Sequence, residues 1–190
     1  MKRYIVGITG ASGSIYGIRT LEALRKVPDA TVHLVMSAQA RRTLAIETKY
    51  SADDVESLAH HVHDPSDVAA PISSGSFLTE GMIVIPCSIK SAAAIAYSFN
   101  DNLLVRAADV CLKERRRLVL VVRETPLHLG HLRTLTRLAE IGATILPPIP
   151  GMYAMPKSVD DIVDHTVGKA LDALGVPNEM FARWRGDGSG

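Results

Sequence analysis

Short clusters of glycine, serine and threonine follow apolar runs of this sequence, and cations join them in places. The first cluster, Thr9–Gly13, comes directly after the apolar run Tyr4–Ile8. Such small residues leave backbone N–H groups free, and N–H groups and hydroxyls together can bind an oxyanion. The cluster is therefore a candidate phosphate cradle, although a tight strand-to-helix turn would use the same residue types.

Residues of similar chemistry follow the later apolar runs. They are, in order, Ser37, Pro86–Ser91, Arg123–Thr125 and Pro147–Tyr153. Arg123 ends an apolar run, where a cation normally has a partner or a ligand. Ligands of open α/β sheets bind beyond the carboxyl ends of the strands, so these residues predict an anion site at one sheet edge.

The opening cluster matches neither common nucleotide motif. Ser12 stands where the second glycine of GxGxxG would be, and no Gly-Lys-Ser/Thr follows as in a P-loop. Flavin mononucleotide (FMN) suits such a loop better than a dinucleotide does, but composition alone leaves the ligand open.

The apolar runs predict strands, because they are nearly continuous in valine, isoleucine and leucine, as strands buried on both faces are. They cover 4–8, 32–36, 82–85, 118–122 and 143–146. Helical patterns lie between them, over 15–24, 38–47, 103–111, 132–139 and 159–174. Strands that alternate with helices predict an α/β fold with a mainly parallel sheet covered on both faces.

Length and composition narrow the class of protein. The 190 residues are 47% hydrophobic and carry a net charge of +1, which argues against general nucleic-acid binding. No apolar run approaches the roughly 20 residues of a membrane span. We expect no signal peptide, no disulfide framework and a cytoplasmic protein. We also expect one flavin-binding domain over 1–185 and a disordered tail over 186–190.

Several longer stretches are specific when taken together: GITGASGSIYGIR, PCSIKS, RAADVCLKERRRLVLVVRETPLHLGHL, EIGATILPPIPGMY and ARWRG. With them the chain resembles, over essentially its whole length, the flavin prenyltransferase family of the UbiX type. The resemblance implies a three-layer, flavodoxin-like (Rossmann-like) fold and a homododecamer. It also implies transfer of a dimethylallyl group from dimethylallyl monophosphate to reduced FMN. The product, prenylated FMN, would serve a UbiD-type decarboxylase, often in ubiquinone biosynthesis.

The resemblance also implies roles for individual residues, in a site built where several subunits meet. The flavin contacts would be Gly10, Ala11, Ser12, Ser37, Ser88, Ile89, Lys90, Ser91 and Arg123. The prenyl-phosphate contacts would be Tyr153 and Lys169, and the residues around the reaction centre Glu47, Arg106, Lys113, Glu124 and Trp184. Position 169 departs from the family, where arginine is usual. Lysine keeps the charge but loses the two-pronged grip on phosphate.

The expected chemistry has a use for these residue types. Cations stabilise the negative charge that grows on a departing phosphate, and aromatic faces stabilise an allyl cation. Ser12, Glu47 and Glu124 could move a proton, and no metal is needed. Each residue has a structural alternative: Lys113 could belong to a charged helix end, Glu124 could pair with Arg123 or Arg106, and Trp184 could be a packing anchor.

Other motifs favour structural interpretations. Asp160, Asp161 and Asp164 match a DDxxD magnesium motif, but we interpret them as acids in the first turn of a helix opened by Ser158. We assign His60, His61 and His63 to an exposed polar helix end. His128 and His131 lie at a helix start and favour capping or an interface. Cys87 is more simply a packed residue than a nucleophile.

Two other function classes remain open at this stage. One is a flavin-dependent cysteine decarboxylase, which would not need a site for a departing phosphate. The other is a non-catalytic flavin carrier. Both would bind FMN, but neither would alkylate it.

Overall fold

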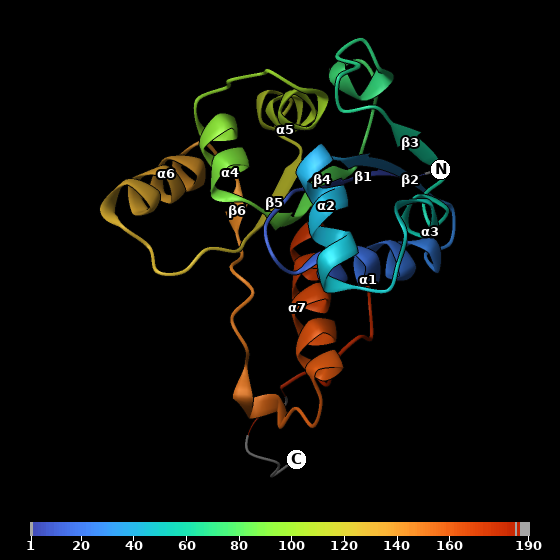
Figure 1. Cartoon of the computed structure of the whole chain (residues 1–190), viewed down its shortest axis with the longest axis vertical. Coiled ribbons are helices and arrows are strands. Elements are labelled where there is room, and N and C mark those ends of the chain that lie inside the picture. Colours follow the sequence, from blue (N-terminus) through green and yellow to red (C-terminus); the bar gives the residue numbers. More distant parts are fainter. Residues whose placement is uncertain (1, 185, 187–190) are drawn as a thin grey trace.

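The fold is built on a parallel sheet, seen in the computed structural model, which describes residues 2–184 and 186 (Figure 1). The strands are β1 (Lys2–Ile8), β2 (Ala30–Met36), β3 (His61–His63), β4 (Gly81–Cys87), β5 (Arg117–Val122) and β6 (Thr144–Ile145). They lie in the order β3-β2-β1-β4-β5-β6, and every neighbouring pair is parallel. Within the described residues the sheet is therefore fully, not mainly, parallel.

Helices cover both faces of this sheet. On one face lie α1 (Ser14–Arg25), α2 (Ala38–Glu47), the short α3 (Ala52–Glu56) and α7 (Val159–Leu174). On the other lie α4 (Ile89–Ala96), α5 (Leu103–Lys113) and α6 (Leu129–Glu140), with the 3-10 turns η1 (Pro71–Ser73) and η2 (Met152–Ala154) in the connections. Two hydrophobic clusters result, one on each face.

Successive residues of a strand contribute to opposite clusters. Tyr4, Val6 and Ile8 of β1 pack under α1 and α7, whereas Ile5 joins the cluster under α4 and α5. All seven residues of β4 are buried. This two-sided burial explains why the strands read as continuous apolar runs.

The architecture confirms the three-layer, flavodoxin-like prediction. Without the edge strand β3, the order is that of flavodoxin-type folds, and with β3 it is the order of Rossmann folds. None of the helices in residues 2–184 combines the length and hydrophobicity that a bilayer crossing requires.

The main differences from expectation are a strand, a helix and the end of β4. The prediction of a helix end at the histidine segment was wrong, because His61–His63 form the edge strand β3. The rings of His61 and His33 of β2 stack with centroids 4.6 Å apart, and His33 Nδ1 lies 3.0 Å from His63 Nε2. Burial, helped by the neighbouring histidines, lowers the pKa of His33 to about 4. Helix α4 was not predicted, and Cys87 closes β4 instead of starting a loop.

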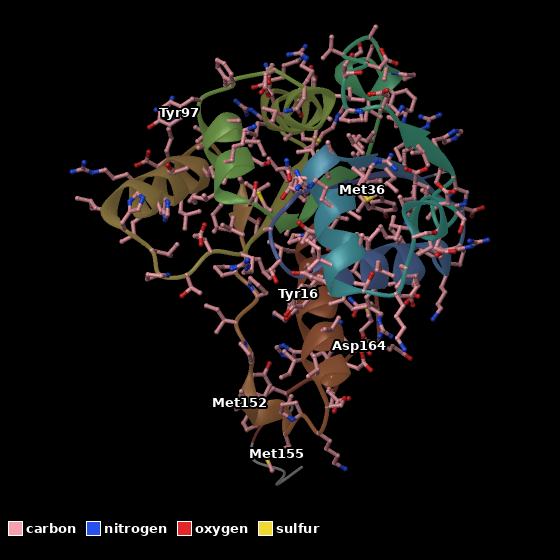
Figure 2. The ribbon with its side chains drawn as sticks, viewed as in Figure 1. Tyr16, Met36, Tyr97, Met152, Met155 and Asp164 are labelled. Atoms are coloured by element: carbon pink, nitrogen blue, oxygen red, sulfur yellow. The ribbon has the colours of Figure 1, made fainter. Side chains whose placement is uncertain are left out.

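An extended segment leaves the sheet after β6. Residues 147–157, called the arm below, run away from the sheet and turn back through η2 into the start of α7 (Figure 1). Met152 and Met155 lie at its far end, 63% and 78% exposed (Figure 2). The predicted tail 186–190 lies, apart from Gly186, outside the described residues.

Candidate active site

A hollow of about 620 Å³ opens at the point where the chain changes direction across the sheet. Strands β1 and β4 are neighbours there, and the helices that follow them cover opposite faces. Ligands of doubly wound sheets bind at this switch point. Residues after four strands line the hollow: Gly10, Ser37, Ala38, Gln39, Pro65, Ser66, Ser88, Lys90, Ser91, Ala94, Asp101, Asn102, Leu104 and Val105.

Serine side chains open two helices at the wall of the hollow. Ser37 accepts a hydrogen bond from the Ala40 amide (3.1 Å) and begins α2. Ser88 accepts one from the Ser91 amide (3.2 Å) and begins α4. The unpaired N–H groups and positive dipole ends of both helices therefore lie at the hollow, and exposed Lys90 adds a full charge. Of the predicted flavin contacts, Gly10, Ser37, Ser88, Lys90 and Ser91 line it.

The opening loop differs from the predicted phosphate cradle. Glu47, at the end of α2, accepts hydrogen bonds from the Gly13 and Ser14 amides at 2.9 and 3.0 Å. Partial burial raises the pKa of this carboxyl, but hydrogen bonds from Ser12, Gly13 and Ser14 outweigh that effect, and the net pKa is lowered. The N-terminus of α1 thus binds an anion of its own chain, whereas the N-termini of α2 and α4 lie at the hollow.

Close backbone contacts hold the opening loop beside the hollow. A Cβ on Gly10 would come within 2.5 Å of the Gln39 Cβ, and one on Gly17 within 2.8 Å of the Ile85 carbonyl oxygen. Larger residues at either position would push the loop or α1 outward. Such a tight cradle with free amides and a cation fits a mononucleotide flavin.

Arg123 lies at the same sheet edge, one strand further along. Its amide donates to the Cys87 carbonyl at 3.0 Å, which holds it beside the end of β4. Its Nε is buried, and in the described part of the chain no acceptor reaches it. A buried, unsatisfied donor on a cation is what an absent ligand would leave. Ala11, Ser12 and Ile89 are near neighbours of lining residues in the sequence but do not line the hollow themselves.

Three predicted reaction-centre residues have other partners within one chain. Arg106 Nε donates to the Ser73 carbonyl at 3.1 Å, and its Nη1 pairs with Asp109 at 3.2 Å. Lys113 is the last residue of α5 and pairs with Glu114. Because α5 has 11 residues, this end of the helix lies roughly 15 Å from the other end, which lines the hollow. Glu124 accepts a hydrogen bond from the Thr125 amide, and neither Arg123 nor Arg106 is its partner in the described residues.

Of the remaining predicted residues, Tyr153 lies on the arm, Lys169 on α7 and Trp184 after α7, and none of the three lines the hollow. The rings of Tyr153 and Trp184 meet edge to face with centroids 5.8 Å apart. Tyr153 Oη also lies 3.0 Å from His165 Nε2 of α7, and Lys169 is exposed one turn further along that helix. Within one chain, the flavin residues and the prenyl-phosphate residues therefore form two separate groups.

Sequence reasoning missed several residues of this arrangement. Asn102 caps α5 by accepting from the Val105 amide at 3.1 Å, and it lines the hollow with Leu104 and Val105. An asparagine directly before an apolar helical stripe is a cap signal, so Asn102 could have been found. Gln39 and His165 carry no such local signal.

The alternative motifs have structural roles. Ser158 and Asp161 form a capping box, and Asp160 and Asp164 pair with Arg19 of α1. His128 Nδ1 caps α6, which confirms the capping interpretation. In residues 2–184 no group of three or more histidines, cysteines or carboxylates is arranged to hold a metal.

Cys87 is not placed for nucleophilic chemistry. It is fully buried at the end of β4, and this burial raises the pKa of its thiol to about 12. A thiol in that state is protonated at neutral pH and inert. The packing interpretation of Cys87 is therefore favoured.

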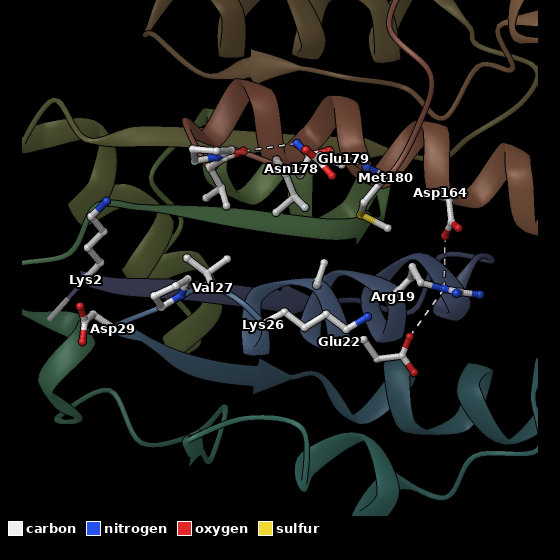
Figure 3. Close-up of a pocket in the computed structure, with 15 residues that line it drawn as sticks. Lys2, Arg19, Glu22, Lys26, Val27, Asp29, Asp164, Asn178, Glu179 and Met180 are labelled. Carbon is white, nitrogen blue, oxygen red and sulfur yellow. Dashed lines mark hydrogen bonds and ion pairs between the residues drawn. The ribbon is translucent and has the colours of Figure 1, made fainter.

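A larger hollow, about 890 Å³, lies between α1, α7 and the segment 176–180 (Figure 3). Arg19, one of the three cations that line it, is already paired with Glu22 and Asp164. It also lies off the carboxyl edge of the sheet, on residues that begin β1 and end α1. We therefore assign the active site to the smaller hollow.

Comparison with known proteins shows the family and agrees with the fold. The model of the Flavoprotein family matches residues 1–171. The flavin prenyltransferase UbiX of Escherichia coli (strain K12) is 58% identical over 188 residues, which cover 98% of this chain and 100% of that protein. Flavin prenyltransferase LpdB of Lactiplantibacillus plantarum is 53% identical over 98% of this chain and 100% of its own length.

Solved structures give the same relation. The crystal structure of AnUbiX (PadA1) in complex with FMN and dimethylallyl pyrophosphate matches with a TM-score of 0.95 and 49% identity, over 97% of this chain and 98% of that one. A dodecameric FMN-dependent UbiX-like decarboxylase from Escherichia coli O157:H7 matches with a TM-score of 0.95 and 50% identity, over 97% and 100%. The cysteine decarboxylase SpaF, at 16% identity, shares only the fold. The chain belongs to the Flavoprotein family and to the UbiX flavin prenyltransferases.

Proposed function

We propose that this protein transfers a dimethylallyl group from dimethylallyl monophosphate to N5 and C6 of reduced FMN. The C–O bond of the allylic phosphate breaks as the bond to N5 forms, and phosphate leaves. The bond to C6 forms at the expense of the prenyl C=C π bond, whose other carbon takes up a proton, while N5 and C6 each release one. The observation that carries the proposal is the 58% identity, over 188 residues, to a protein named for flavin prenylation. Prenylated FMN would pass to a UbiD-type decarboxylase, often in ubiquinone biosynthesis.

The switch-point hollow supports the flavin half of this proposal. Ser37 and Ser88, which open α2 and α4, and Lys90 would hold the phosphate of FMN. Arg123, whose Nε has no acceptor in the described residues, would donate to the isoalloxazine. FMN supplies the nucleophilic ring atoms when bound. The protein orients it and excludes water.

The arm supports the donor half. Tyr153 and Lys169 would bind the phosphate of the prenyl donor and stabilise its growing negative charge, and Trp184 would face the allyl group. These residues lie apart from the hollow in one chain, so a second subunit must bring them to it. A homododecamer, as named for the Escherichia coli O157:H7 relative, would do so and would add Arg106 and Lys113.

Proton removal needs a base near the flavin. Glu47 lies at the opening loop, where it accepts from the Gly13 and Ser14 amides, and interactions with Ser12, Gly13 and Ser14 lower its pKa and keep it ionised at neutral pH. Glu47 is therefore placed to receive a proton through Ser12, and Glu124 is a second carboxylate at the same edge. We propose that the reaction needs no metal. We also propose a cytoplasmic location, which suits the two free, buried cysteines.

The test is anaerobic incubation of the purified protein with reduced FMN and dimethylallyl monophosphate in the presence of a chelator. Mass spectrometry of the released flavin should show one added prenyl unit, and oxidised FMN or omission of the donor should give none. Unchanged flavin from a folded, FMN-binding protein would contradict the proposal. Peptides ending in cysteine would then test the decarboxylase alternative.

A further inference from the structure

His165 is a polar side chain of the arm region to which the mechanism above gives no role. Its Nε2 lies 3.0 Å from the hydroxyl oxygen of Tyr153, which joins the arm to α7. Tyr153 is 53% exposed, and its ring also contacts the ring of Trp184. This hydrogen bond therefore fixes where the Tyr153 hydroxyl lies.

The imidazole of His165 is itself held in place. Phe181 packs on it with centroids 4.8 Å apart, and Tyr153 meets it edge to face at 5.7 Å. Gly151 lets the arm approach this closely, because a Cβ there would come within 3.1 Å of the His165 Cε1. At Gly168 a Cβ would come within 2.4 Å of Phe181, so that glycine lets the phenyl ring lie against α7.

Lys169 follows His165 at the i+4 position of α7, so the two side chains lie on the same face of the helix, one turn apart. The hydrogen bond to His165 therefore places the Tyr153 hydroxyl near the face that carries the Lys169 ammonium. An anion bound by both Lys169 and Tyr153 would receive a hydrogen bond from the hydroxyl only if Tyr153 can donate its proton to it.

Two hydrogen-bond directions fit the observed distance. If Nε2 accepts, the Tyr153 proton is committed to His165 and the hydroxyl can offer the anion no donor. If Nε2 donates, the hydroxyl oxygen accepts from His165 and its own proton is free for the anion. The phosphomonoester dianion, which prevails at neutral pH, only accepts hydrogen bonds, so its binding selects the second arrangement.

We propose that His165 is a positioning residue that donates its Nε2–H to Tyr153 and so directs the Tyr153 hydroxyl proton to the phosphate of the prenyl donor. The inference rests on the proposed function, because it takes that phosphate as the anion. His165 does not touch the reacting atoms. It acts through Tyr153.

The test compares H165L, which cannot donate, with H165Q, whose amide can. With saturating reduced FMN, H165L should raise the KM for dimethylallyl monophosphate about tenfold, the order that a lost hydrogen bond to a charged group gives, and change kcat less. H165Q should restore most of the affinity. Trp184, the single tryptophan, gives a second readout without flavin: dimethylallyl monophosphate should change its fluorescence at lower concentration in wild type than in H165L.

Matched variants separate positioning from damage. In a Y153F background, H165L should not raise the KM further, because the hydroxyl through which His165 acts on the phosphate is already absent. H61L, the same substitution on the distant edge strand, should leave KM unchanged. Equal KM in wild type and H165L, or a defect in H165L that persists in the Y153F background, would overturn the inference while prenylation itself stands. A wild-type protein that neither prenylates FMN nor responds to the donor would overturn the proposed function and this inference with it.

Discussion

The hollow at the sheet edge and the arm are built in opposite ways. The hollow lies where four strands end, and its helix caps and the Glu47 carboxylate are satisfied within the chain. Tyr153, Ile149 and Met155 of the arm are 53%, 72% and 78% exposed, and Trp184, whose ring contacts Tyr153, is 66% exposed. One chain brings five of the nine predicted flavin contacts to the hollow but leaves the proposed donor residues on the surface. Under the proposed function, the donor side therefore depends on contact with other subunits.

The largest effect is expected on the hollow side, from Arg123→Ala. The variant loses a partly buried cation whose Nε has no acceptor in the described residues. Removing a charged hydrogen-bond donor costs about 1.5–3 kcal/mol, so the Kd for FMN should rise roughly 10- to 100-fold. Flavin fluorescence titration measures this, and Arg123→Lys should recover part of the loss. Undiminished flavin binding and turnover would remove Arg123 from the site.

A smaller effect is expected on the arm side, from Lys169→Ala. Loss of an exposed charge near the donor phosphate should raise the KM for the prenyl donor by about fivefold, or about 1 kcal/mol, and leave FMN affinity unchanged. Lys169→Arg should keep or improve the wild-type KM, because arginine binds phosphate with two donors. If Lys169→Arg abolished activity in a folded protein, the assignment of Lys169 to the donor phosphate would be wrong. If Lys169→Ala changed the affinity for FMN, the donor residues and the flavin hollow would not be independent.

The smallest effect concerns stability, from Glu47→Gln. Glutamine keeps an acceptor for the Gly13 and Ser14 amides but loses the charge at the N-terminus of α1, worth about 0.5–1 kcal/mol. Because the folded pKa of Glu47 is lowered, its stabilisation is full above the ordinary value of 4.5 and is lost as pH falls through the folded pKa. Urea unfolding should therefore separate wild type from variant at pH 7, and the gap should narrow below pH 4.5. A gap that widened on acidification would contradict the capping role.

Most of the fold was predictable because buried parallel strands carry a strong signal. Helix α2 was predicted over 38–47 and α7 over 159–174, the ranges that the structure gives. The misses have local causes. Strand β3 has three residues, two of them histidine, and α4 is a short run of small apolar residues that directly follows a strand, without a distinct period of its own.

The site was predictable only in part. Residues directly after strands could be placed at the sheet edge by topology, and Ser37, Ser88 and Lys90 do line the hollow. The capture of the Gly13 amide by Glu47, 34 positions away, depends on how α2 lies against α1, which no local pattern encodes. The interaction of Arg106 with Ser73 is non-local in the same way. Lys169 and Trp184 came from the family resemblance alone. Tyr153 was also expected at the sheet edge because it follows the last predicted strand, but no residue of 147–153 lines the hollow.

The two short outer strands have a consequence for handling the protein. A parallel sheet with seven-residue strands at its centre would offer long rows of unpaired N–H and C=O groups if it ended there, and such edges recruit other chains. Here the sheet ends in the three residues of β3 on one side and the two of β6 on the other. Little unpaired backbone is left as a template, so concentrated solutions should resist growth into amyloid-like fibrils even though the arm is rich in exposed apolar side chains.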